Sequence, residues 1–170
     1  MEPIKIALIG CGGMSGAHMN AFRALWNKEL KLFDIVATCD VVEERAQERA
    51  KQAEEFQGKK PSIFTDFQDM LDKIPDIEAV DICTLHSEHH SIAVPCLDAG
   101  KHVIIEKPLG ITMRACKLML DASVKAQRVL AVAENYRLSV HERMRRWAIQ
   151  QGRIGKPRMF FWQDVGESLG

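Results

Sequence analysis

The stretch "IKIALIGCGGMSG", residues 4–16, decides the fold of this chain. It joins an apolar run of strand length to a glycine-rich loop, and such runs are typical of strands buried in a parallel sheet. Gly10 permits a tight turn after the strand, and Gly12 lets a pyrophosphate approach the backbone without a Cβ in the way. The stretch therefore predicts a strand, a phosphate-binding loop and the start of a helix, with a plain strand-to-helix turn as the alternative.

Strand-length apolar runs recur along the chain and alternate with segments of helical period. The further runs are "DIVATC" (34–39), "SIF" (62–64), "AVDIC" (79–83), "HVIIE" (102–106) and "VLAVA" (129–133). Such alternation is expected of β-α-β units, which make all strands parallel and cover the sheet with helices. The predicted fold is therefore α/β: a Rossmann doubly wound parallel sheet of about six strands.

Two of the helical segments carry more detailed predictions. Ala17, Ala21 and Leu25 recur at a spacing of four, which predicts the buried face of the helix that follows the glycine loop. Pro95 stands inside the segment "SIAVPCLDAG". Because proline is tolerated only in the first turn of a regular helix, this helix is expected either to begin late, near Ile92, or to be kinked.

Asp40 ends the second predicted strand and is the candidate ligand for a cofactor ribose. A carboxylate at this position can accept hydrogen bonds from both ribose hydroxyls of an adenosine, and it repels a 2′-phosphate. No arginine follows until Arg45, so NAD is favoured over NADP as the cofactor. The alternative is that Asp40 caps the helix that starts near Glu43.

Charge and cysteine content exclude several classes of protein. The chain has 170 residues, with 23 Lys plus Arg and 23 Asp plus Glu, so no net field attracts nucleic acid or an anionic membrane. No CxxC pair occurs, and we expect reduced core thiols and no bound metal. The five cysteines are at positions 11, 39, 83, 96 and 116. No apolar stretch approaches ~18 residues, so a soluble cytoplasmic protein is expected.

Two further stretches, together with the glycine loop, carry a resemblance to a known family. "CTLHSEHHSIAVPCLDAGKHVIIEKPLGIT" (83–112) and "AENYRL" (133–138), taken with "GCGGMSG" (10–16), resemble the glucose-fructose oxidoreductase, inositol dehydrogenase and rhizopine catabolism family, Gfo/Idh/MocA. The resemblance implies an NAD(P)-dependent oxidoreductase that transfers a hydride between the nicotinamide and a sugar, polyol or inositol-like carbinol. The sequence departs from the family pattern at Leu85, where proline is usual, and at His86, where asparagine is common.

The resemblance also implies roles for individual residues. The positions implied to bind cofactor are Gly10, Gly12, Gly13 and Met14 at the pyrophosphate, Asp40 at the ribose, Thr84 and His89 along the cofactor, Glu106 and Lys107 at the nicotinamide, and Asn135 in the last loop. Lys107 is the implied catalytic residue, because its ammonium can hydrogen-bond the reacting oxygen and lower its proton affinity. Glu106 is expected to orient that ammonium, and Pro108 to set the bend.

The same resemblance divides the chain into two parts. Residues 1–138 are expected to form the dinucleotide-binding domain. Residues 139–170 are expected to form a connecting helix and the first strand, around 158–162, of a truncated substrate domain that in the family supplies a catalytic Asp and His. The full-length protein is expected to be a homo-oligomer that binds a small sugar or polyol, and neither nucleic acid nor a membrane.

Three alternatives stay open at this point. A non-catalytic dinucleotide sensor would use the same fold, because fold alone does not fix function. A methyltransferase also combines a glycine-rich loop with an acid after the second strand, but it has no use for "EKP" or "ENYR". Finally, His86, His89 and His90 are close enough in sequence to form a metal cluster, although no cysteine or carboxylate pattern beyond Glu88 accompanies them.

Overall fold

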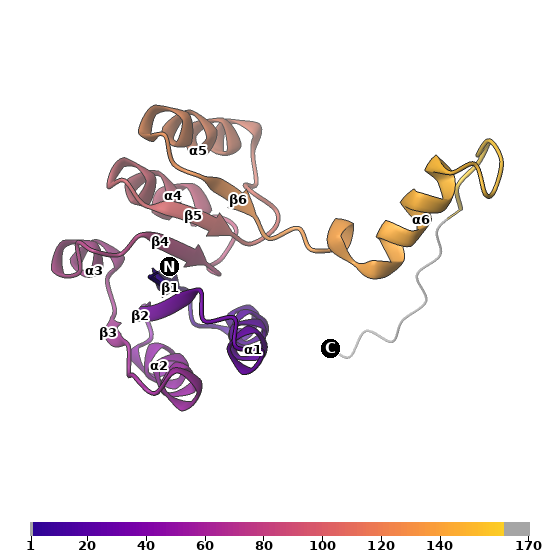
Figure 1. Ribbon diagram of the computed structural model, residues 1–170. Coiled ribbons are helices and arrows are strands. Elements are labelled where there is room, and N and C mark those ends of the chain that lie inside the picture. The colour runs from indigo at the N-terminus through magenta and orange to yellow at the C-terminus, as the bar shows by residue number, and fades with distance from the viewer. Residues whose placement is uncertain (1, 162–170) are drawn as a thin grey trace. The chain divides into compact units, whose positions relative to one another are not determined.

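The computed structural model describes residues 2–161 of the chain (Figure 1). The chain forms two compact units, residues 1–133 and residues 134–170, which are described separately. Among the described residues, no helix combines the length and apolar character that crossing a lipid bilayer requires.

The first unit is built on a six-stranded sheet in which every strand pairs in parallel. The strands are β1 (Ile4–Ile9), β2 (Phe33–Cys39), β3 (Ser62–Phe64), β4 (Ala79–Ile82), β5 (His102–Ile105) and β6 (Leu130–Val132). Their order across the sheet is β3-β2-β1-β4-β5-β6. This is the Rossmann order, so the predicted α/β doubly wound fold is confirmed. Each of the six strands predicted for this sheet also lies within one residue of the observed one at either end.

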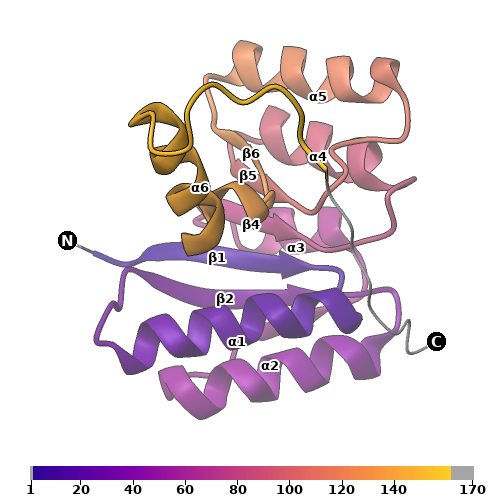
Figure 2. The ribbon, with the colours of Figure 1, turned by 90° about the vertical axis from the view of Figure 1, so that its right-hand side faces the viewer.

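Helices cover both faces of this sheet. They are α1 (Gly13–Asn27), α2 (Glu43–Gln57), α3 (Phe67–Lys73), α4 (His89–Asp98) and α5 (Met113–Ala126). Alternate residues of β1 point to opposite faces, as a strand requires. Ala7 and Ile9 join the core under α3, α4 and α5, while Leu8 joins the core under α1 and α2. Figure 2 shows α1 and α2 lying together along β1 and β2.

One helix prediction was wrong, and one of the two alternatives given for another helix was wrong. Ala17, Ala21 and Leu25 are exposed, and the fully buried positions of α1 are Ser15 and Met19. The helix that contains Pro95 begins at His89 and not near Ile92, and the proline lies inside it. Proline removes one backbone donor there, and the helix nevertheless continues to Asp98 with most of its residues around the proline buried, which leaves the kinked helix as the remaining alternative.

The second unit contains a 3₁₀ turn (Tyr136–Leu138) and α6 (Val140–Gln150). Ser139 caps α6, since its hydroxyl accepts a hydrogen bond from the Glu142 backbone N–H at 3.2 Å. The predicted strand around 158–162 is not formed over 158–161, and Trp162 lies outside the described residues. A strand needs a neighbour for its backbone groups, and no described strand pairs with this segment.

Candidate functional site

The glycine loop between β1 and α1 packs closely against the chain on one side and is open to a ligand on the other. Gly10 has a φ of +88°, and a Cβ added there would lie 2.7 Å from the Cys83 carbonyl carbon, so the backbone just after β4 leaves room only for glycine. At Gly12 and Gly13 an added Cβ would meet nothing within 4 Å. Both residues border a cavity, so their backbone is open to a ligand.

Helix α1 begins at this loop, and no side chain caps the backbone N–H groups of its first turn. Its N-cap, Gly12, provides no side-chain acceptor, and the first turn holds no acidic residue. The amides of a first helical turn have no partner within the helix, and the helix dipole adds partial positive charge there. The loop and helix start therefore form a site for an anion such as a pyrophosphate.

The cavity has a volume of about 650 Å³ and lies at the carboxyl ends of β1, β2, β3 and β4. Of the residues predicted to bind cofactor, it brings together Gly10, Gly12, Gly13, Met14, Asp40 and Thr84. It is also lined by residues that the sequence did not single out, including Val41, Phe67, Gln68 and Glu88. The strand order reverses between β1 and β4, which is where doubly wound sheets bind their ligands.

Asp40 joins the end of β2 to the glycine loop. Its Oδ2 accepts a hydrogen bond from the Cys11 backbone N–H at 2.7 Å, and its Oδ1 accepts one from the Val42 N–H at 2.9 Å. The alternative that Asp40 caps the next helix is wrong, because the N-cap of α2 is Val42 and no side chain caps it. Each carboxylate oxygen keeps a second lone pair, so the group can still accept from ribose hydroxyls.

Arg49 supports the glycine loop from α2, a role that the sequence analysis missed. Its Nε donates to Ser15 Oγ and its Nη2 donates to the Gly12 carbonyl, both at 2.9 Å, while Ser15 Oγ donates to the same carbonyl at 2.6 Å. Ser15, at the third position of the glycine pattern, is therefore bonded as well as small. The buried guanidinium adds positive charge beside the anion site.

Thr84 and His89 follow β4 but lie in different surroundings. Thr84 lines the cavity and its buried hydroxyl has no protein partner. His89 is fully buried and does not line the cavity. Its Nδ1 lies 3.0 Å from the Pro108 carbonyl oxygen and 3.2 Å from that of Leu109. Carbonyls only accept, so Nδ1 carries the proton and His89 supports the loop after β5.

Glu106 and Lys107 follow β5 and do not line the cavity. Glu106 is buried, and its Oε2 accepts the Lys107 backbone N–H at 2.9 Å. Its Oε1 lies 2.9 Å from Nε2 of His18. Glu106 thus contacts the backbone amide of Lys107 and the ring of His18, and not the lysine ammonium as expected. Lys107 itself is exposed, and the Lys107–Pro108 peptide bond is cis.

Two further predictions concern other residues. Asn135 belongs to the second unit, where it precedes the 3₁₀ turn. The histidine metal alternative gains no support, because the described group with metal-ligand spacing is His18, Asp81 and Cys83, not His86, His89 and His90. The five cysteines are free, and burial raises the pKa of the Cys11 and Cys39 thiols to about 12. These two thiols near the loop are therefore uncharged core groups.

Comparison with known proteins agrees with this geometry. Residues 4–134 match the model of an oxidoreductase family with an NAD-binding Rossmann fold, Gfo/Idh/MocA. The chain is 34% identical to levoglucosan dehydrogenase of Pseudarthrobacter phenanthrenivorans, covering 92% of this chain and 39% of the relative. A solved structure of levoglucosan dehydrogenase with NADH superposes with a TM-score of 0.77 at 32% identity, covering 91% of this chain and 41% of that one.

Two further relatives show how varied the matched proteins are. Inositol 2-dehydrogenase/D-chiro-inositol 3-dehydrogenase of Lactiplantibacillus plantarum is 29% identical, with 91% of this chain and 42% of the relative covered. An α-N-acetylgalactosaminidase of Shewanella oneidensis is 26% identical, with 92% and 34% covered. The chain therefore spans well under half the length of the relatives that it matches.

Proposed function

Because this chain belongs to the Gfo/Idh/MocA oxidoreductase family, whose Rossmann domain binds NAD, we propose that it is the cofactor-binding half of a dehydrogenase acting on a sugar, polyol or inositol-like carbinol. One observation carries the proposal. The cavity at the reversal of strand order is bounded by both the uncapped start of α1 and the carboxylate of Asp40. A dinucleotide needs these two features at one place, for its pyrophosphate and its ribose.

The described residues fit NAD. The pyrophosphate would be held by the open backbone at Gly12 and Gly13 and by the first-turn amides of α1, and the adenosine ribose by Asp40. Arg49 keeps the loop in the shape that this requires. When bound, NAD supplies the hydride acceptor for oxidation of a carbinol, or the donor for the reverse reaction.

Lys107 is the residue that we assign to substrate. Its ammonium is exposed and forms no ion pair with the described residues, so its three donors are available to an incoming hydroxyl. A hydrogen bond from this cation would stabilise negative charge that develops on the reacting oxygen. Glu106 fixes the lysine backbone through its amide. We assign removal of the hydroxyl proton to the substrate domain.

The proposal extends to the whole protein. The second unit, beginning near Glu134, would introduce the substrate domain, and Asn135 would contact the cofactor from there. The whole protein would be a cytoplasmic homo-oligomer that takes a small sugar or polyol.

The experiment that tests the function uses the full-length protein. NADH binding is measured by fluorescence titration, and NAD reduction is then followed by absorbance with a panel of sugars, anhydrosugars and inositols as substrates. We expect saturable NADH binding and substrate-dependent reduction of NAD by at least one compound.

Each alternative has its own outcome in this experiment. Tight NADH binding with no turnover on any compound would favour a dinucleotide sensor. Binding of S-adenosylmethionine in place of NADH would favour a methyltransferase. Release of sugar from an N-acetylgalactosaminide, without net formation of NADH, would place the protein with its glycosidase relative.

Asp40→Asn is expected to weaken NADH binding by about tenfold, because it replaces charge-assisted hydrogen bonds to the ribose with neutral ones. It should also narrow the preference for NADH over NADPH, since the charge that repels a 2′-phosphate is lost. Fluorescence titration with both cofactors gives this ratio of Kd values. A loss of stability alone would weaken both cofactors equally, and an unchanged ratio would contradict the assignment of Asp40 to the ribose.

A further inference from the structure

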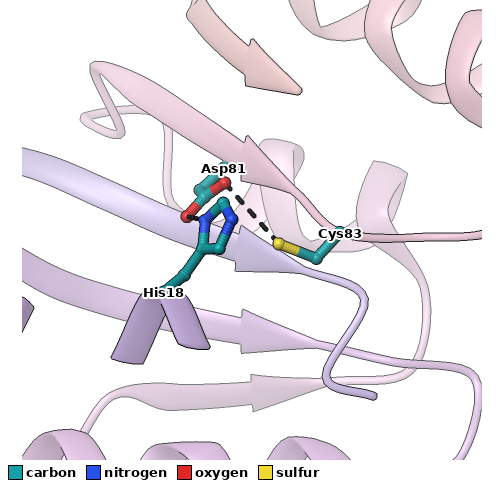
Figure 3. A group of neighbouring side chains, drawn as sticks. All are labelled: His18, Asp81 and Cys83. Carbon is teal, nitrogen blue, oxygen red and sulfur yellow. Dashed lines mark hydrogen bonds and ion pairs between the residues drawn. The ribbon is translucent and has the colours of Figure 1, made fainter. Parts of the chain in front are cut away.

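His18 lies between two buried carboxylates at the carboxyl end of the sheet, on the side of helix α1. Its Nδ1 is 2.8 Å from Asp81 Oδ2, and its Nε2 is 2.9 Å from Glu106 Oε1. Side-chain exposure is 16% for His18, 1% for Asp81 and 10% for Glu106, so water has little access to the group. Figure 3 shows the imidazole directed at Asp81, with Cys83 beside the same carboxylate.

The imidazole donates through both of its nitrogens. Each ring nitrogen lies at hydrogen-bond distance from a carboxylate oxygen, and this arrangement favours the doubly protonated imidazolium, which can donate through both nitrogens. The hydrogen bond to Asp81, with the charges of Asp81 and Glu106, outweighs burial and raises the pKa of His18 to about 9. On the other side of Asp81, the Cys83 thiol donates to Oδ1 at 3.7 Å. Cys83, Asp81, His18 and Glu106 thus form a continuous chain of hydrogen bonds.

These residues fit a hydrogen-bonded group better than they fit a metal site. One ligand atom each from His18, Asp81 and Cys83 lies within 4.8 Å of the others. A metal would require a neutral imidazole and a thiolate. Both ring nitrogens of His18 already face carboxylate oxygens, and the Cys83 thiol already donates to Asp81, so these groups satisfy one another without a metal. The nitrogen–oxygen spacing of 2.8 Å is that of a hydrogen bond.

This chain of hydrogen bonds ends at the backbone N–H of Lys107, the residue to which we assign contact with the substrate. Asp81 holds the imidazolium, the imidazolium holds Oε1 of Glu106, and Oε2 of Glu106 accepts the Lys107 amide at 2.9 Å. His18 belongs to the same helix whose first turn, at Gly13, borders the cavity. A helix is rigid over so short a distance, so α1 sets the spacing between the anion site and the Lys107 corner.

We propose that His18 is a positioning residue for hydride transfer, which fixes Lys107 relative to the cofactor by clamping Glu106 against Asp81. The inference rests on the dehydrogenase function proposed above. It assigns no contact with substrate to the histidine: removing the imidazole frees Glu106 to rotate, and the lysine backbone then loses its acceptor.

The decisive experiment compares His18→Leu in two backgrounds of the full-length enzyme. In the wild-type background we expect kcat to fall by 10- to 100-fold while the Kd for NADH changes by less than about threefold, because the anion site is intact. In the Lys107→Ala background we expect no further loss of kcat, because the histidine acts through the lysine. An equal loss in both backgrounds would show a merely structural role and would overturn the proposal.

A second measurement does not depend on turnover. Hydrogen exchange of the Lys107 amide, observed by NMR, should accelerate by tenfold or more in His18→Leu, because the clamp on its acceptor is gone. The control is His102→Leu, at the opposite end of β5, where the imidazole accepts from the Val129 N–H at 3.0 Å. It removes a comparable hydrogen bond, and exchange at Lys107 should stay unchanged. Unchanged exchange in His18→Leu would also overturn the proposal.

The outcomes separate this inference from the proposed function. If the wild-type enzyme reduces NAD and Lys107→Ala impairs it, the function stands, and full kcat in His18→Leu then removes the inference alone. If the wild-type enzyme reduces no NAD on any compound, the function fails, while amide exchange still reports on the clamp. His18→Gln keeps one donor and serves if the leucine variant does not fold, with an intermediate loss of kcat expected.

Discussion

Lys107→Ala in the full-length enzyme is expected to lower kcat for NAD reduction by about 100-fold or more, with the Kd for NADH changed by less than about threefold. Lys107 does not line the cavity in which the anion site and Asp40 lie, so its loss leaves that part of the binding site intact. The effect is confined to the step in which charge develops on the substrate oxygen. Steady-state kinetics and a fluorescence titration of the same preparation separate the two quantities.

The matched control for this prediction is Lys117→Ala. Lys117 is exposed on α5 and pairs with Asp121 four residues later, so its removal deletes the same charge away from the β5 loop. Exposed pairs of this kind contribute little to stability. The control should retain wild-type kcat, and a Lys107→Ala enzyme with kcat within twofold of wild type would remove the lysine from the mechanism.

Gly10→Ala is expected to lower the free energy of unfolding by about 3 kcal/mol or more and to abolish measurable NADH binding. The added Cβ would lie 2.7 Å from a backbone carbon of Cys83, and the φ of +88° is itself unfavourable for alanine. Backbone atoms cannot rotate away as a side chain can, so the end of β4 or the glycine loop must move. Urea unfolding of both proteins measures the difference in stability.

Gly58→Ala separates the two causes of that loss. Gly58 has a similar φ of +74° at the end of α2, but an added Cβ there meets nothing within 4 Å. Its replacement should cost about 1 kcal/mol and leave NADH binding intact. Equal losses in the two variants would mean that the backbone angle, and not contact with Cys83, explains the need for glycine at position 10.

The strands of the sheet could be predicted from the sequence, because buried parallel strands are continuous apolar runs with sharp ends. The sequence was insufficient for α1, where alanines at positions 17 and 21 satisfied a helical spacing although alanine is too small to show which face is buried. It also failed at 158–161, because an isolated segment has strand propensity but no strand until another strand pairs with it.

Within the site, sequence motifs found the residues that line the cavity but not those that hold them in place. Arg49 bonds to Ser15 across 34 positions, and His18 bonds to Asp81 across 63. No local pattern encodes such pairs. A partial signal existed for Arg49, since it occurs within the buried row formed by Ala46, Ala50 and Ala53, where a charged residue needs partners.

The charged imidazole of His18 also makes the proton a ligand of the folded state. Its pKa of about 9 in the native protein lies above the ordinary value of 6.5. Between these two pH values, His18 is protonated in the folded state and deprotonated in the unfolded state. The associated stabilisation, on the order of 3 kcal/mol, is fully present below pH 6.5 and is lost as the pH rises through about 9. Deprotonation of His18 in mild alkali therefore weakens the hydrogen bonds that join α1 to Asp81 of β4 and to Glu106 after β5.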